Sequence, residues 1–102
     1  MSKLESIEDY GVVVGYMFDC PGCGMAHALH IHPFKNDNGA SWRWNGDMEK
    51  PTFSPSILVR IQFERSDKPD IVCHSYVRDG LIQFLSDCSH SFAGKTVEML
   101  NV

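Results

Sequence analysis

Residues that favour β-strands recur along the chain in short runs. Residues 10–18 are rich in valine and aromatic side chains, and residues 26–32 and 57–64 alternate between apolar and polar positions. A period of two is the repeat of a strand with one buried face. Two shorter runs, 41–45 and 96–100, have a similar character. The pattern therefore predicts a mainly β chain with little helix.

A strong turn signal lies between the apolar runs 71–77 and 81–86. The dipeptide at 79–80 is Asp-Gly, which is a preferred pair for a two-residue β-hairpin turn. This turn places Val77 opposite Ile82, with both side chains on the same face of the hairpin.

The same register decides which downstream cysteines are neighbours. Counting outward from the turn, Cys73 and Cys88 become diagonal neighbours on one face, and His74 lies on the opposite face. A slip of one residue would separate the two thiols. After the hairpin, residues 87–94 predict one helical turn, with Asp87 as its N-cap.

Composition limits the classes of protein that fit. The chain has 102 residues, enough for one domain, and a formal charge of −4, which argues against general attraction to nucleic acid. No window is long and apolar enough to span a membrane, and the acidic start lacks the apolar core of a signal peptide. We therefore expect a cytoplasmic protein with reduced thiols.

Cysteine spacing carries the clearest chemistry. The segment Cys20-Pro21-Gly22-Cys23-Gly24 puts two thiols on a tight turn, and Cys73 and Cys88 supply a second pair. Two cysteines separated by two residues, as Cys20 and Cys23 are, typically form half of a tetrahedral zinc site. We predict one zinc ion bound by Cys20, Cys23, Cys73 and Cys88, with His74 or His90 as alternates for a downstream cysteine.

These elements together predict a small, single-domain antiparallel β fold that zinc staples, with zinc-ribbon-like elements. Residues 1–9 are expected to be a loose lead-in, and residues 10–102 the zinc-binding β domain. A metal that closes a loop of about fifty residues removes much entropy from the unfolded chain.

Catalytic chemistry is harder to find. A catalytic zinc would need an open coordination position and a base such as Asp87, Glu98 or His90, but no His-Glu-x-x-His motif is present. Cys88 and His90 are a weaker candidate for a nucleophilic pair. No Ser/His/Asp pattern is evident, so the sequence predicts no catalytic residue and favours structural zinc.

Other residues allow two interpretations each. His27, His30 and His32 offer a second metal site or, as we favour, a partly exposed polar strand face. Trp42 and Trp44 fill a small core or anchor a contact surface, and with Phe53 they form the candidate binding surface. The segment 51–56, which has a proline on either side of Phe53, is a rigid connector or a binding loop.

Several motifs in order resemble one family. They are Cys20-Pro21-Gly22-Cys23-Gly24, Trp42-Arg43-Trp44-Asn45-Gly46, Pro51-Thr52-Phe53-Ser54-Pro55-Ser56, the segment 73–80 (CHSYVRDG) and the segment 82–90 (IQFLSDCSH). Over roughly residues 16–98 the chain resembles the family called domain of unknown function 6527. Members of that family are often mislabelled as ammonia monooxygenase, an activity that a short chain without membrane spans does not fit.

The resemblance implies an origin in a phage or another mobile element, and the expected location is the host-cell cytoplasm if a phage encodes the protein. Small phage proteins commonly bind host machinery, including defence systems, and relatives of this family occur beside bacterial ubiquitin-like conjugation genes. We therefore expect a non-enzymatic binding module with structural zinc that acts on a host protein, and no nucleic-acid or membrane partner. The alternative is a zinc-dependent hydrolase acting on a peptide or isopeptide bond.

Overall fold

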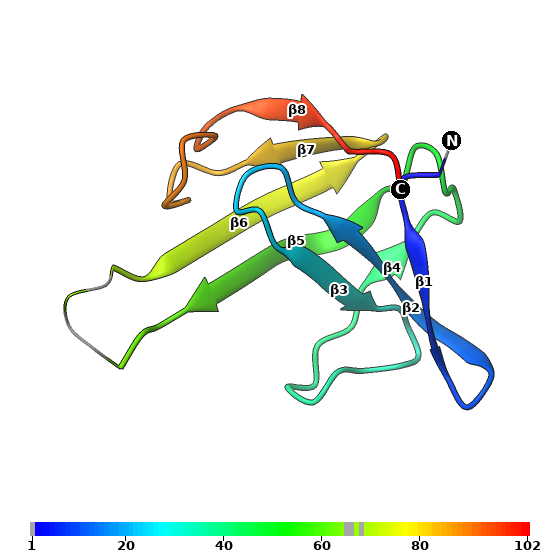
Figure 1. Cartoon of the computed structure of the whole chain (residues 1–102). Helices are drawn as coiled ribbons and strands as arrows, with labels where there is room; N and C mark the ends of the chain where they lie inside the picture. The colour runs from blue at the N-terminus through cyan, green and yellow to red at the C-terminus, as the bar shows by residue number, and fades with distance from the viewer. Residues whose placement is uncertain (1, 65–66, 68) are drawn as a thin grey trace.

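Two antiparallel β-sheets form the molecule (Figure 1). The structure is a computed structural model that describes residues 2–64, 67 and 69–102. Within these residues there is no helix, and the first sheet has the order β1-β2-β3 while the second has the order β4-β5-β6-β7-β8. The strands are β1 (Glu5–Asp9), β2 (Val12–Asp19), β3 (Ala26–His30), β4 (Arg43–Trp44), β5 (Phe53–Ile61), β6 (Ile71–Arg78), β7 (Leu81–Phe84) and β8 (Thr96–Glu98).

The start of the chain is more ordered than its sequence suggests. Residues 5–9, expected to be a loose lead-in, form β1 and pair with β2, from Glu5 opposite Met17 to Asp9 opposite Val12. Most side chains of β1 are exposed, so this edge strand has no apolar alternation to reveal it. Leu4, just before it, is only 2% exposed and anchors the strand to the core.

The predicted hairpin between β6 and β7 is confirmed. Val77 pairs with Ile82, and the turn residues Asp79 and Gly80 have positive φ values of 50° and 75°. Two consecutive positive φ values are what a type I′ turn requires. The register expected from the sequence therefore holds, and with it the placement of Cys73 and His74 on opposite faces.

Strand β5 begins earlier than predicted. It includes part of the segment that we interpreted as a connector or binding loop, and its pairing with β6 is irregular between Phe53 and Ile57. The peptide bond between Ser54 and Pro55 is cis. Because proline cannot donate to a ladder, a bulge is where a strand accommodates it. Ser56 lies at the end of this irregular stretch.

The chain after β7 forms turns rather than the predicted helical turn. Gly94 N–H donates to Phe84 O at 3.1 Å, and Lys95 N–H donates to Phe92 O at 2.9 Å. Two further bonds attach this segment to β6: Leu85 N–H donates to His74 O, and Ser89 N–H donates to Val72 O, each at 2.9 Å. Residues 85–89 thus continue the edge of the sheet beside β6.

The core lies between the two sheets. In Figure 1 the strands β2 and β3 cross in front of the five-stranded sheet, and buried side chains from both sheets form one cluster. The buried cluster contains Leu4, Phe18, Cys20, Leu29, Phe53, Ile57, Cys73, Val77, Ile82, Phe84, Cys88 and Met99.

No described segment is a helix with the length and apolarity to cross a membrane.

Candidate active site and metal cluster

Strand β6 separates two groups of polar side chains. Cys73 pairs with Val59 and is 1% exposed, so its side chain lies in the core. His74 pairs with Leu58, which is 57% exposed. Successive side chains of a strand point to opposite faces, and the sheet therefore has a thiol on its inner face and an imidazole on its outer face.

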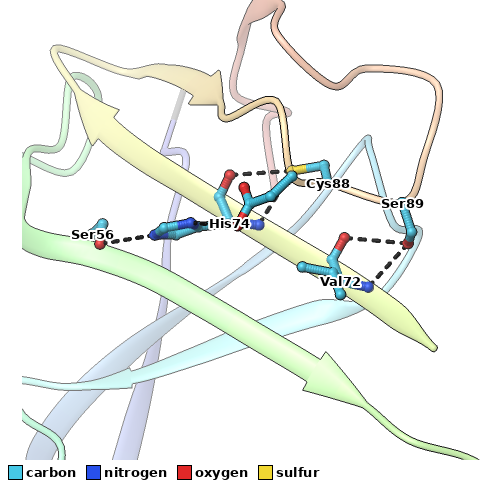
Figure 2. Close-up of polar contacts among 6 residues, drawn as sticks. Ser56, Val72, His74, Cys88 and Ser89 are labelled. Atoms are coloured by element: carbon cyan, nitrogen blue, oxygen red, sulfur yellow. Dashed lines mark hydrogen bonds and ion pairs between the residues drawn. The ribbon is translucent and has the colours of Figure 1, made fainter.

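On the outer face the ring of His74 lies between a serine and an aspartate. Its Nε2 is 3.2 Å from Ser56 Oγ, and its Nδ1 is 3.1 Å from Asp87 Oδ2. A carboxylate only accepts hydrogen bonds, so Nδ1 donates to Asp87, and Nε2 of the neutral ring accepts from the Ser56 hydroxyl. Figure 2 shows the ring of His74 reaching from β6 toward Ser56 on β5.

Ser56 is held from its other side by a tryptophan. The indole N–H of Trp42 donates to Ser56 O at 3.3 Å. Together with the irregular pairing of β5 before Ile57, this bond sets where the strand presents the serine hydroxyl. Trp42 thus has a position beside the candidate site, although it packs half-buried against the core.

Asp87 is held in place by the two residues that follow it in the chain. The next residue, Cys88, contacts the backbone of His74 twice, because His74 N–H donates to Cys88 Sγ and Cys88 Sγ–H donates to His74 O, each at 3.2 Å. Ser89 makes an analogous pair of contacts with Val72, at 2.9 Å to its N–H and 3.3 Å to its carbonyl (Figure 2). This double attachment fixes Asp87 opposite Nδ1 of His74.

This arrangement was not predicted from the sequence. Ser56 is 18 residues before His74, and Asp87 is 13 residues after it, and the three come from a bulged strand, a regular strand and a turn. The signal that was available is the hairpin register, which places His74 on the outer face away from the cysteines. His74, predicted as an alternate metal ligand, has both ring nitrogens engaged in this outer site.

On the inner face four side chains converge. One ligand atom from each of Cys20, Cys23, His27 and Cys73 lies within 4.8 Å of the others. The Sγ atoms of Cys20 and Cys73 are 3.7 Å apart, and Cys23 Sγ is 3.5 Å from His27 Nε2. A tetrahedral zinc ion with Zn–S of about 2.3 Å and Zn–N of about 2.0 Å requires separations of about 3.8 Å and 3.5 Å, so the geometry fits such an ion.

Three of the four residues that we predicted as zinc ligands are therefore brought together, and the fourth member of this group is a histidine. His27 is 2% exposed, so our interpretation of it as part of a partly exposed strand face is wrong. It pairs with Phe18 across β2 and β3. Because Cys20 lies two residues after Phe18, alternation places the thiol on the same inward face. That register is the signal by which the sequence could have identified His27.

The thiols of the cluster differ in acidity. The side-chain hydrogen bond shared by Cys20 and Cys73 lowers the pKa of Cys20 and raises that of Cys73. Burial raises the pKa of Cys23. All four cysteines are free thiols, and a sulfur–sulfur distance of 3.7 Å is far longer than a disulfide bond of about 2.05 Å.

Cys88 and His90 lie beside the cluster. Their ligand atoms and that of Cys73 are within 4.8 Å of one another. Nδ1 of His90 accepts a hydrogen bond from Phe92 N–H at 3.2 Å, so the neutral ring carries its proton on the buried Nε2. That nitrogen has no hydrogen-bond partner among the described residues. With its proton it cannot bind a metal, but it is free to donate to a nearby thiolate, as groups around metal ligands do.

The candidate binding surface is only partly exposed. Phe53 is 2% exposed and belongs to the core, so it does not contribute to a contact surface. Trp44 is half-buried and packs on Tyr16 with ring centroids 4.3 Å apart. The core interpretation of the two tryptophans thus accounts for most of their contacts, while Leu58 and Arg60, which line a groove beside Trp42, are exposed.

A serine, a histidine and an aspartate hydrogen-bonded in this order are the arrangement that serine hydrolases use, on several unrelated folds. The chain belongs to the family of the bacterial ubiquitination-like system serine protease (BubE), whose model matches residues 3–85. Ser56 and His74 lie inside that match and Asp87 two residues beyond it, and the matching model is not that of domain of unknown function 6527. Searches of curated proteins and of solved structures found no match.

Proposed function

We propose that the chain is a serine peptidase in which Ser56 is the nucleophile, His74 the general base and Asp87 the group that orients His74. The observation that supports this is the position of the His74 ring, with Nε2 3.2 Å from Ser56 Oγ and Nδ1 3.1 Å from Asp87 Oδ2. These distances lie within or close to hydrogen-bond reach for a base and its nucleophile.

The chemistry follows from these contacts. Ser56 Oγ attacks the substrate carbonyl carbon while its proton passes to Nε2 of His74, and the carboxylate of Asp87 stabilises the imidazolium that forms. The same proton is then transferred to the leaving amine, which leaves an acyl group on Ser56. A water molecule activated by His74 hydrolyses this ester and regenerates the serine.

The substrate class comes from the family description. That description names a serine protease of a bacterial ubiquitination-like system, which supports a protein substrate and cleavage of a peptide or isopeptide bond. The bond class agrees with the alternative that the sequence suggested, but the reacting atom is a serine oxygen. A zinc-bound water is disfavoured because the metal cluster lies on the core face and offers four protein groups, enough for all four positions of a tetrahedral ion.

The metal cluster supports a second proposal, that Cys20, Cys23, His27 and Cys73 hold one zinc ion in a structural role. His27→Cys should retain zinc, because it creates a four-thiolate site, whereas His27→Leu should lose it. His30→Leu is the matched control on the same strand, outside the cluster. The zinc content of each purified protein is measured. Loss of zinc in His27→Leu but not in His30→Leu supports His27 as the fourth ligand, and zinc retained in both variants contradicts it.

The direct test of the proposed activity is labelling with a fluorophosphonate probe, which forms a covalent bond with an activated serine. Mass spectrometry should place the probe on Ser56 of the wild type, and Ser56→Ala and His74→Ala should not react. Ser54→Ala is the matched control, since Ser54 is an exposed serine on the same strand. Absence of labelling on a folded wild type would contradict the proposal and favour the binding module acting on a host protein.

A further inference from the structure

One edge of β5 has no neighbouring strand over most of its length. Strand β4 pairs only with Phe53 and Ser54, whereas β6 pairs with β5 as far as Ile61. On the side away from β6, residues 57–61 therefore have no strand partner among the described parts of the chain. This open edge begins directly after Ser56.

The hydrogen bonds of β6 show which groups of β5 face this edge. The N–H and C=O of His74 bond to Cys88 and Leu85, and those of Val72 bond to Ser89. Both residues thus direct their backbone groups away from β5.

Their partners across the ladder, Leu58 and Arg60, consequently form non-hydrogen-bonded pairs with them. The N–H and C=O groups of Leu58 and Arg60 point to the open edge.

A second open edge lies opposite. Strand β3 is at the edge of the first sheet, and His30 O accepts from Trp42 N–H at 2.9 Å rather than from β2. Alternation gives Ala28 the same outward orientation. Between the two edges is a groove of about 270 Å³, lined by residues 27–29, Trp42 and residues 57–60, together with Asn36 and Asn38.

We propose that an extended segment of the substrate polypeptide binds in this groove as an added β-strand, pairing with the backbone of Leu58 and Arg60. This inference rests on the proposed function, because it is the position of Ser56 at the end of the edge that makes the groove a substrate site. Main-chain pairing provides affinity for any extended sequence, and side-chain pockets select among sequences. Leu58, which is 57% exposed, adds an apolar contact beside the serine.

A proline at position 60 tests the pairing. Arg60→Pro removes an N–H that faces the open edge and none that bonds to β6, which is where strands tolerate proline. Arg60→Ala is the reference that removes the side chain alone. The wild type first digests a library of peptides from a bacterial proteome, and mass spectrometry identifies the cleaved peptides. For these peptides, we expect the ratio of kcat/KM to the fluorophosphonate labelling rate to fall about tenfold in Arg60→Pro relative to Arg60→Ala.

A measurement on the substrate avoids any effect of proline on folding. A cleaved peptide is resynthesised with a single N-methyl group at each backbone nitrogen in turn. Pairing with β5 predicts that cleavage is lost at positions two residues apart and retained between them. Equal sensitivity at all positions, equal ratios for the two Arg60 variants, or labelling of Ser56 without cleavage of any library peptide would overturn this inference. Absence of labelling would instead overturn the proposed function.

Discussion

Cys73 and His74 are consecutive residues of β6 that belong to different sites on opposite faces of the sheet. Cys73 Sγ is 3.7 Å from Cys20 Sγ in the core, while His74 Nε2 is 3.2 Å from Ser56 Oγ on the outer face. Because strand alternation fixes this relationship, the metal cluster and the candidate catalytic base share one segment of backbone. Whatever holds Cys73 in place also restricts where His74 can lie.

Asp87→Asn should impair catalysis without unfolding the protein. An amide that donates to Nδ1 of His74 favours the wrong tautomer, in which Nε2 cannot accept the serine proton. The expected loss is roughly 10³- to 10⁴-fold, measured as kcat on a library peptide or as the rate of labelling by the fluorophosphonate probe. Glu98→Gln, an equivalent change on the exposed edge strand β8, is the control. Equal rates for the two variants would remove Asp87 from the site.

Cys88 distinguishes a hydrogen-bonding role from a metal-ligand role. The structure shows its thiol bound to the backbone of His74, and Cys88→Ser preserves a group that both donates and accepts. Cys88→Ala should lower kcat by about 10- to 100-fold, because Asp87 loses its attachment, whereas Cys88→Ser should stay close to the wild type. Metal content is measured alongside. Loss of metal in both variants would restore Cys88 to the ligand set that the sequence predicted.

Removal of the metal should abolish both stability and activity. Four ligands from separated parts of a small chain make binding and folding one process, so a chelator is expected to lower the melting temperature sharply or unfold the protein. Cadmium, which thiolates also bind well, should restore both properties because the proposed reaction proceeds at Ser56. Unchanged melting after verified metal removal would contradict the structural role, and activity that returns with zinc alone would indicate a catalytic one.

Gly22 should not tolerate a side chain. A Cβ at this position would contact Cε1 of His90, lie 2.7 Å from its Nε2 and lie 2.8 Å from Phe84 Cζ. Gly22→Ala is therefore expected to destabilise the protein by about 1–3 kcal/mol, measured by urea unfolding of the metal-loaded form. In a double-mutant cycle with His90→Ala, the two costs should be less than additive. Full additivity would show that the ring of His90 does not limit the space at Gly22.

Most of the fold could be predicted from the sequence, because strands with one buried face show an alternation of apolar and polar residues. The hairpin at 79–80 was predicted with its register, since turn chemistry and alternation agree there. Strand β1 was missed because exposed acidic residues occupy most of it, and the start of β5 was missed because a proline interrupts it. Strand β1 pairs with the adjacent strand β2 across a turn at Tyr10 and Gly11 that was not predicted. The start of β5 pairs with Val77, which is distant in the sequence, and periodicity does not reveal such a partner.

The candidate site divides in the same way. The cysteine spacing identified Cys20, Cys23 and Cys73, whose convergence is a local turn joined to one strand. His27 was not predicted, because its place in the cluster depends on the register of β2 with β3. The Ser56–His74–Asp87 arrangement depends on a bulge and on turns around Cys88, and no short motif records that geometry. Only the distances between the three side chains define it.

The residues of the metal cluster also come from both sheets. Cys20, Cys23 and His27 belong to the hairpin of β2 and β3, and Cys73 belongs to β6. An ion bound by all four joins the two layers at one point in the core, so opening either layer requires the other to open or the ion to leave. Native-state hydrogen exchange should then report one cooperative unit with the ion bound and separate opening of the three-stranded sheet without it.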